Sequence, residues 1–69
     1  MTKEGHMTNT IGMRLRKLRG DRTQAQIAKD LGISVSAVGA YEMGVRVPRD
    51  PLKKEMAKYF GTTVQDLFF

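Results

Sequence analysis

The fold of this chain is decided by residues 23–44, which read TQAQIAKDLGISVSAVGAYEMG. Apolar residues recur at helical spacing on both sides of Gly32, and the stretch ends at a second glycine, Gly44. Glycine tolerates the left-handed backbone conformation in which many helices end. The stretch therefore predicts two short helices joined by a tight turn.

Polar residues mark the start of both helices. Thr23 is a good N-cap residue, and Gln26 follows three residues later, which is the capping-box pattern. Ser34 is expected to cap the second helix in the same way. The side chains expected to face inward are Ile27, Ala28 and Leu31 in the first helix, and Ala37, Val38 and Tyr41 in the second.

The same residues satisfy the requirements of a helix-turn-helix unit. Two helices can approach closely where a small residue lies, here Ala28, and the turn between them contains Gly32. Ile33 just after the turn and Val38 in the second helix can hold the pair together as apolar plugs. The second helix can then project from the domain and enter a major groove, which is about 12 Å wide.

Helical spacing extends on both sides of this unit. We expect a helix from about Thr10 to Arg19, and a fourth helix from near Asp50, with this acid at the N-cap and Pro51 at the first helical position. A last short helix should follow Thr62 or Thr63. No segment alternates apolar and polar residues over the length of a paired strand. The chain is therefore predicted to be an all-α, compact five-helix bundle.

Composition narrows the class of partner. The chain has 69 residues and a formal net charge of +5, which favours a polyanion such as nucleic acid. It contains no cysteine and one histidine, so a disulfide is excluded and a structural zinc site is not expected. We expect no cofactor, and we see no motif for a small-molecule ligand. No apolar run approaches the roughly 20 residues of a membrane span, and a cytoplasmic location fits the absence of cysteine.

The N-terminal segment is expected to lie outside the domain. Residues 1–8 are predicted to be disordered, and residues 9–69 to form the helix-turn-helix domain. Within the segment, Gly5-His6-Met7 has the look of a cloning remnant, with Met7 as the native start. His6 would then have no function.

The ordered set of motifs resembles the Cro/C1-type family, also called the XRE family. The set comprises Thr23-Gln24, Ile27-Ala28, Leu31-Gly-Ile-Ser34, Glu42-x-Gly44, Pro48 and the terminal Thr63-x-x-Asp-Leu-Phe, within about residues 11–68. The resemblance implies a lambda-repressor-like bundle of five helices, often dimeric on DNA. It also implies a sequence-specific transcriptional regulator of double-stranded DNA, most simply a repressor on a palindromic operator.

The resemblance implies a role for individual residues. The residues expected to contact the DNA backbone are Thr23, Gln24, Ser34, Arg46 and Arg49. The residues expected to meet base edges are Val35, Ser36, Gly39 and Ala40, which we call the reading face. A structural ion pair is expected between Arg19 and Glu42. The reading face is poor in hydrogen-bonding groups, which leads to the hypothesis that specificity depends on thymine methyl contacts, groove shape and phosphate register.

The C-terminus carries more apolar surface than so small a core needs. One interpretation is a homodimer interface formed by Val64, Leu67, Phe68 and Phe69, and the alternative is that Phe68 folds back into the core. The chain could also be part of a longer repressor.

Two other function classes are less consistent with the sequence. An enzyme is disfavoured because the sequence has no nucleophile–base pair, no phosphate loop and no metal-ligand set. A protein-interaction adaptor or antitoxin-type module on the same fold is the alternative to a DNA-binding regulator. The poor reading face favours the adaptor, and the net positive charge argues against it.

Overall fold

A computed structural model of the chain describes the backbone of residues 3–69 and the side chains of residues 10–69. Five helices form this part of the chain: α1 (Lys3–Arg19), α2 (Gln24–Leu31), α3 (Val35–Glu42), α4 (Asp50–Phe60) and α5 (Val64–Phe68). No strand occurs within residues 3–69, so the predicted all-α, five-helix fold is confirmed.

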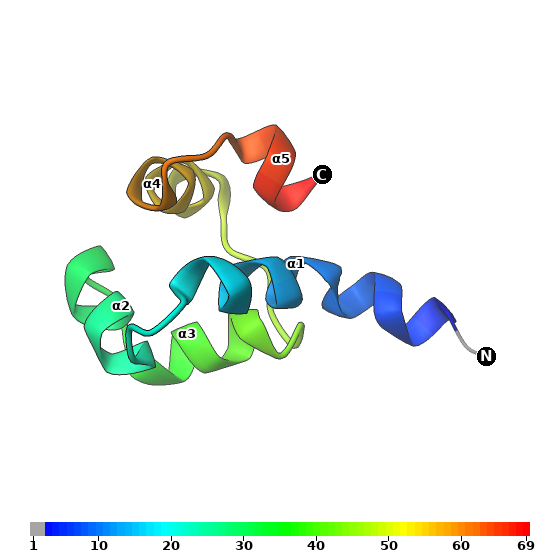
Figure 1. Cartoon of the computed structure of the whole chain (residues 1–69), viewed down its shortest axis with the longest axis horizontal. Coiled ribbons are helices and arrows are strands. Elements are labelled where there is room, and N and C mark those ends of the chain that lie inside the picture. Colours follow the sequence, from blue (N-terminus) through cyan, green and yellow to red (C-terminus); the bar gives the residue numbers. More distant parts are fainter. Residues whose placement is uncertain (1–2) are drawn as a thin grey trace.

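Helix α1 occupies the middle of the bundle. It packs against α3 on one side and α5 on the other, and α2 lies against both α3 and α4 (Figure 1). The helix-turn-helix pair α2–α3 therefore forms one side of the molecule, and α4 with α5 forms the opposite side.

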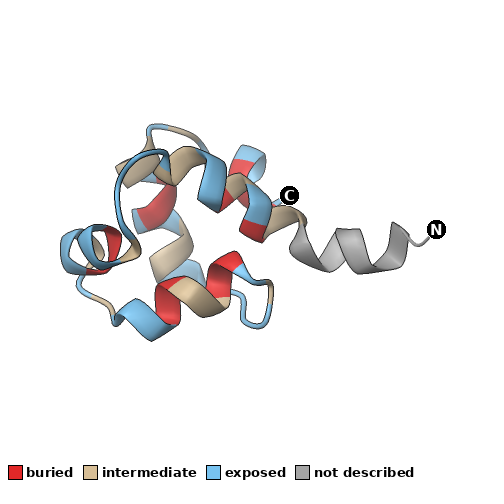
Figure 2. Cartoon of the chain, turned by 60° about the horizontal axis from the view of Figure 1, so that its bottom comes forward, coloured by how far each residue is buried: buried red, intermediate tan, exposed pale blue. Residues whose placement is uncertain are grey.

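The core consists of two adjoining groups of buried side chains. The larger group contains Leu15, Ala37, Tyr41, Met56, Leu67 and Phe68, and the smaller contains Ile27, Ala28 and Val38. Leu31, Ile33 and Phe60 pack against both groups and so connect them. Buried positions face the centre of the molecule, and the exposed positions of α3 face away from it (Figure 2). Ile33 and Val38 thus act as the predicted plugs.

Side-chain caps begin the helices of the central unit, as predicted. The Thr23 hydroxyl accepts a hydrogen bond from the Gln26 amide N–H at 3.0 Å, and the Ser34 hydroxyl accepts one from Ala37 at 3.0 Å. The reciprocal bond of the capping box, from the Thr23 N–H to the Gln26 side-chain oxygen, is not formed among the described residues; the Gln26 Nε2 donates to Asp30 Oδ1 at 2.9 Å. Gly32 ends α2 with a φ of 70°, the left-handed conformation that glycine adopts without strain.

Two predicted helix starts differ from the structure. Helix α1 begins at Lys3 and not at Thr10. Met1 and Thr2 lie outside the described residues. The division into segment 1–8 and domain 9–69 stays a prediction. The N-cap of α4 is Arg49, so Asp50 and Pro51 are its first two residues. Proline fits there because amides of the first helical turn have no partner within the helix.

Helices α1 and α3 approach each other closely at Gly12. A Cβ placed on Gly12 of α1 would lie 2.1 Å from the Glu42 carbonyl oxygen at the end of α3. Glycine is therefore required here, and its absence of a side chain lets α1 and α3 pack directly. Ala28, which was expected at such a contact, is buried in the smaller core group.

Helices long and apolar enough to span a lipid bilayer do not occur among the described residues.

Candidate nucleic-acid interface

The four residues of the reading face lie together on the outward side of α3. Val35 is 47% exposed, Ser36 is exposed, and Gly39 and Ala40 are partly exposed. The opposite side of the helix is held in the core by Ala37, Val38 and Tyr41. The burial of that side fixes the direction in which the reading face points.

Two hydroxyl groups lie at the starts of α2 and α3, where a DNA phosphate could bind. Thr23 and Ser34 are both exposed, and each hydroxyl oxygen accepts the cap hydrogen bond of its helix. A hydroxyl that accepts such a bond still has its own hydrogen to donate. A phosphate oxygen at either helix start could accept that hydrogen.

The expected ion pair between Arg19 and Glu42 is present. Arg19 Nε donates to Glu42 Oε2 at 2.7 Å, and Arg19 NH2 donates to Oε1 at 3.1 Å. The Glu42 side chain is only 5% exposed and that of Arg19 is 22% exposed, so this pair connects the end of α1 to the end of α3 largely out of water. The hydrogen bond to Glu42 raises the pKa of Arg19 above its ordinary value.

Gln24 belongs to the same polar network. Its Nε2 donates to Glu42 Oε1 at 3.0 Å, so the side chain expected at a DNA phosphate is also bonded within the protein. This contact was not among the sequence predictions, since the resemblance suggested the pair of Arg19 and Glu42 alone. The signal available was three polar residues at the facing ends of three neighbouring helices.

Arg46 and Arg49 lie in the exposed loop between α3 and α4. The Arg46 guanidinium carbon is 5.4 Å from the centre of the Tyr41 ring, a cation–π distance. Both arginines line a hollow of about 500 Å³, whose other lining residues are Tyr41, Val47, Pro51 and Leu52. The loop thus presents two exposed cations beside the buried end of α3.

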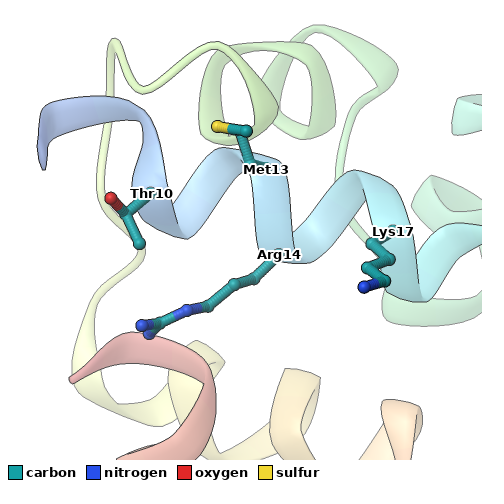
Figure 3. Close-up of a pocket in the computed structure, with 4 residues that line it drawn as sticks. All are labelled: Thr10, Met13, Arg14 and Lys17. Carbon is teal, nitrogen blue, oxygen red and sulfur yellow. The ribbon is translucent and has the colours of Figure 1, made fainter. Parts of the chain in front are cut away.

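Most of the arginines near α1 have partners within the protein. Arg14 extends from α1 to α5 (Figure 3) and donates to the carbonyl oxygens of Asp66 and Leu67, at 3.3 Å each. Arg22 donates to the carbonyl oxygens of Leu18 and Arg19. Arg14 and Arg22 therefore connect helix ends within the protein.

A separate hollow of about 400 Å³ lies on α1 itself, lined by Thr10, Met13, Arg14 and Lys17 (Figure 3). None of these residues belongs to the helix-turn-helix unit.

The predicted dimer interface needs correction. Leu67 is 1% exposed and Phe68 is 5% exposed, because both pack into the core of the single chain. Their side chains cannot also form an intermolecular surface in this fold. Phe69 is 72% exposed and Val64 is partly exposed. Only these two residues of the four therefore remain available to a second copy.

Comparison with known proteins agrees with this geometry. The model of the helix-turn-helix family HTH_3 matches residues 13–67. An uncharacterized HTH-type transcriptional regulator of Methanocaldococcus jannaschii is 39% identical over 46 residues, which cover 67% of this chain and 70% of that protein. No solved structure matches the chain.

The fold and the matched residues define a helix-turn-helix domain. This chain belongs to the Cro/C1-type helix-turn-helix family, whose members are DNA-binding transcription regulators.

Proposed function

We propose that this protein is a sequence-specific regulator of transcription that represses as a homodimer on a palindromic operator. The observation that supports the proposal best is the outward face of α3, fixed by core packing behind it and flanked by Thr23, Ser34 and the loop arginines. Each subunit would place α3 in a major groove. The two half-sites would then lie about 34 Å apart, one turn of DNA.

The two kinds of contact have separate tasks. Thr23, Ser34, Arg46 and Arg49 would bind the backbone and set the register of α3. Val35 and Ala40 would contact thymine methyl groups, and Ser36 would donate to or accept from a base edge. The repressor would act in the cytoplasm, and no step requires a cofactor.

Selection from a random pool of duplex DNA tests the proposal. The purified chain should enrich a palindromic motif, and Ser36→Ala should change the preference at one position of each half-site. A matched control is Gln65→Ala, which removes an exposed side chain from α5 and should leave the motif unchanged. A folded protein that enriches no motif at low salt would contradict the proposal.

The homodimer is tested by its remaining interface residues. Phe69→Asp should shift the protein from dimer to monomer in analytical ultracentrifugation and weaken binding to the full palindrome more than binding to a half-site. An unchanged dimer would place the interface elsewhere on the molecule.

A second candidate is the adaptor that binds protein. Three exposed apolar side chains at or near the α3–α4 loop favour it: Met43, Val45 and Val47, at 69%, 70% and 57% exposure. Salt separates the two candidates, since DNA binding releases counterions and weakens steeply as salt rises, whereas an apolar protein contact does not.

A further inference from the structure

The side-chain amide of Gln24 is held in one orientation. Its partner Glu42 is ion-paired with Arg19, and an ionised carboxylate only accepts hydrogen bonds. The NH₂ group of Gln24 must therefore face Glu42, to which it donates at 3.0 Å. The carbonyl oxygen Oε1 consequently faces the other way.

That oxygen lies over the one position of the reading face that has no side chain. A Cβ placed on Gly39 would be 3.7 Å from Gln24 Oε1, an ordinary van der Waals distance, and no other non-local atom would lie within 4 Å among the described residues. Within the described part of the chain, the side-chain hydrogen bond of Gln24 is the one from Nε2 to Glu42, and none is formed to Oε1. Gln24 thus presents an acceptor beside Gly39, where a longer residue would place its own side chain.

The chemistry of this acceptor differs from what a phosphate requires. A phosphate diester oxygen has no hydrogen to donate, so it cannot bond Oε1. In the major groove, the donors are the amino groups N6 of adenine and N4 of cytosine. The rest of the reading face supplies two apolar side chains and one hydroxyl, so an added acceptor would change what the helix can distinguish.

We propose that Gln24 is a specificity-determining residue that accepts a hydrogen bond from a base amino group, with Glu42 and Arg19 as its positioning residues. The inference rests on the proposed function, and it assigns to a base edge a residue that the family resemblance assigns to the backbone. A side chain longer than alanine at position 39 would lie against Oε1.

The test uses the motif selected by the wild-type protein. Selection is repeated with Gln24→Ala and with Gln24→Met, which keeps the length of the side chain, after circular dichroism shows that each is folded. Both variants should lose the preference for adenine or cytosine at one position of each half-site and keep the others. The control Gln65→Ala should retain the full motif.

Binding to modified DNA then isolates the contact. At the position identified, adenine is replaced by purine, or cytosine by 2-pyrimidinone, each of which lacks the amino group. Affinity of the wild-type protein should fall on the order of tenfold, as expected for one hydrogen bond. The Gln24 variants should show no such fall.

The outcomes separate the two proposals. If the Gln24 variants weaken binding to all sequences equally and remain sensitive to loss of the amino group, Gln24 is a phosphate contact and this inference is overturned, while the proposed function stands. If the folded wild-type protein selects no motif, the proposed function fails, and this inference fails with it.

Discussion

The carboxylate of Glu42 is the one buried charged or polar side chain among residues 10–69. It receives hydrogen bonds from Arg19 and Gln24, so three helices meet at a single acidic group. Removal of one partner from a buried ion pair leaves the other without compensation for its lost hydration, which is more costly than the pair is stabilising.

The first prediction concerns this pair. Glu42→Gln should lower the free energy of unfolding by about 2–4 kcal/mol, because Arg19 then lacks its anionic partner. The matched control is Asp50→Asn, which removes the exposed partner of Lys53 in an ion pair of 3.7 Å and should cost less than about 1 kcal/mol. Urea denaturation measures both. Equal effects of the two substitutions would mean that burial of Glu42 contributes nothing.

The stabilisation that the hydrogen bond between Tyr59 and Asp30 provides should depend on pH. The Tyr59 hydroxyl donates to Asp30 Oδ2 at 2.5 Å, and this bond lowers the pKa of Asp30 below its ordinary value of 3.8. Because the folded-state pKa is the lower one, the stabilisation is present above pH 3.8 and is lost as the pH falls through the folded-state pKa. Tyr59→Phe should therefore destabilise the protein near pH 6 and have a smaller effect near pH 2.

Urea denaturation across that range measures the difference between Tyr59→Phe and the wild type. In an Asp30→Asn background, the effect of Tyr59→Phe should no longer depend on pH below pH 6. A difference that is the same at pH 2 and pH 6 in the wild-type background would show that Tyr59 acts by packing alone.

At the scale of helices, the structure distinguishes two glycines that look alike in the sequence. Gly12 and Gly39 both lie inside helices, where glycine is unfavourable relative to alanine. A side chain on Gly12 would collide with the backbone of Glu42, whereas one on Gly39 would meet only Gln24 Oε1 at a normal distance.

Opposite effects of alanine are therefore expected at the two sites. Gly12→Ala should destabilise the protein by more than about 2 kcal/mol, because α1 and α3 must move apart. Gly39→Ala should stabilise it by up to about 1 kcal/mol through helix propensity. Thermal denaturation of the two variants checks both signs, and stabilisation by Gly12→Ala would contradict the described packing of α1 on α3.

The features that could be predicted from the sequence are local to one helix, whereas contacts between helices could not be predicted. Helix caps at Thr23 and Ser34 and the stop at Gly32 were predictable because they depend on residues within one turn. The contact at Gly12 and the bond from Gln24 to Glu42 join different helices, and their geometry follows only from how the helices pack. The sequence left open whether Phe68 joins the core or a dimer interface for a similar reason, since an apolar stripe does not reveal whether it faces its own core or a partner. The structure buries both Phe68 and Leu67 in the core of the single chain.

For the whole molecule, the net charge indicates the capacity to bind DNA phosphate less well than the location of each cation does. Arg14, Arg19 and Arg22 bond to acceptors within the protein, although the +5 charge counts them fully. Arg46 and Arg49 are exposed in the α3–α4 loop and are the cations proposed to meet phosphate.

Loss of these two loop cations should reduce the salt dependence of DNA binding. Arg46→Gln combined with Arg49→Gln should make the slope of log K against log salt less negative by about 2 per subunit. The control combines Lys54→Gln with Lys58→Gln, two exposed lysines of α4, and should change the slope little. Equal changes in both double variants would mean that only overall charge matters.

The most direct test of the central claim is the affinity of the wild-type protein for its selected duplex, measured from 50 to 200 mM salt by fluorescence anisotropy. If two subunits each bring two arginines to phosphate, log K should fall with log salt with a slope of about −4, and a scrambled duplex should bind at least about a thousandfold more weakly. A slope near zero, or equal affinity for the scrambled duplex, would contradict the account of this protein as a sequence-specific DNA-binding regulator.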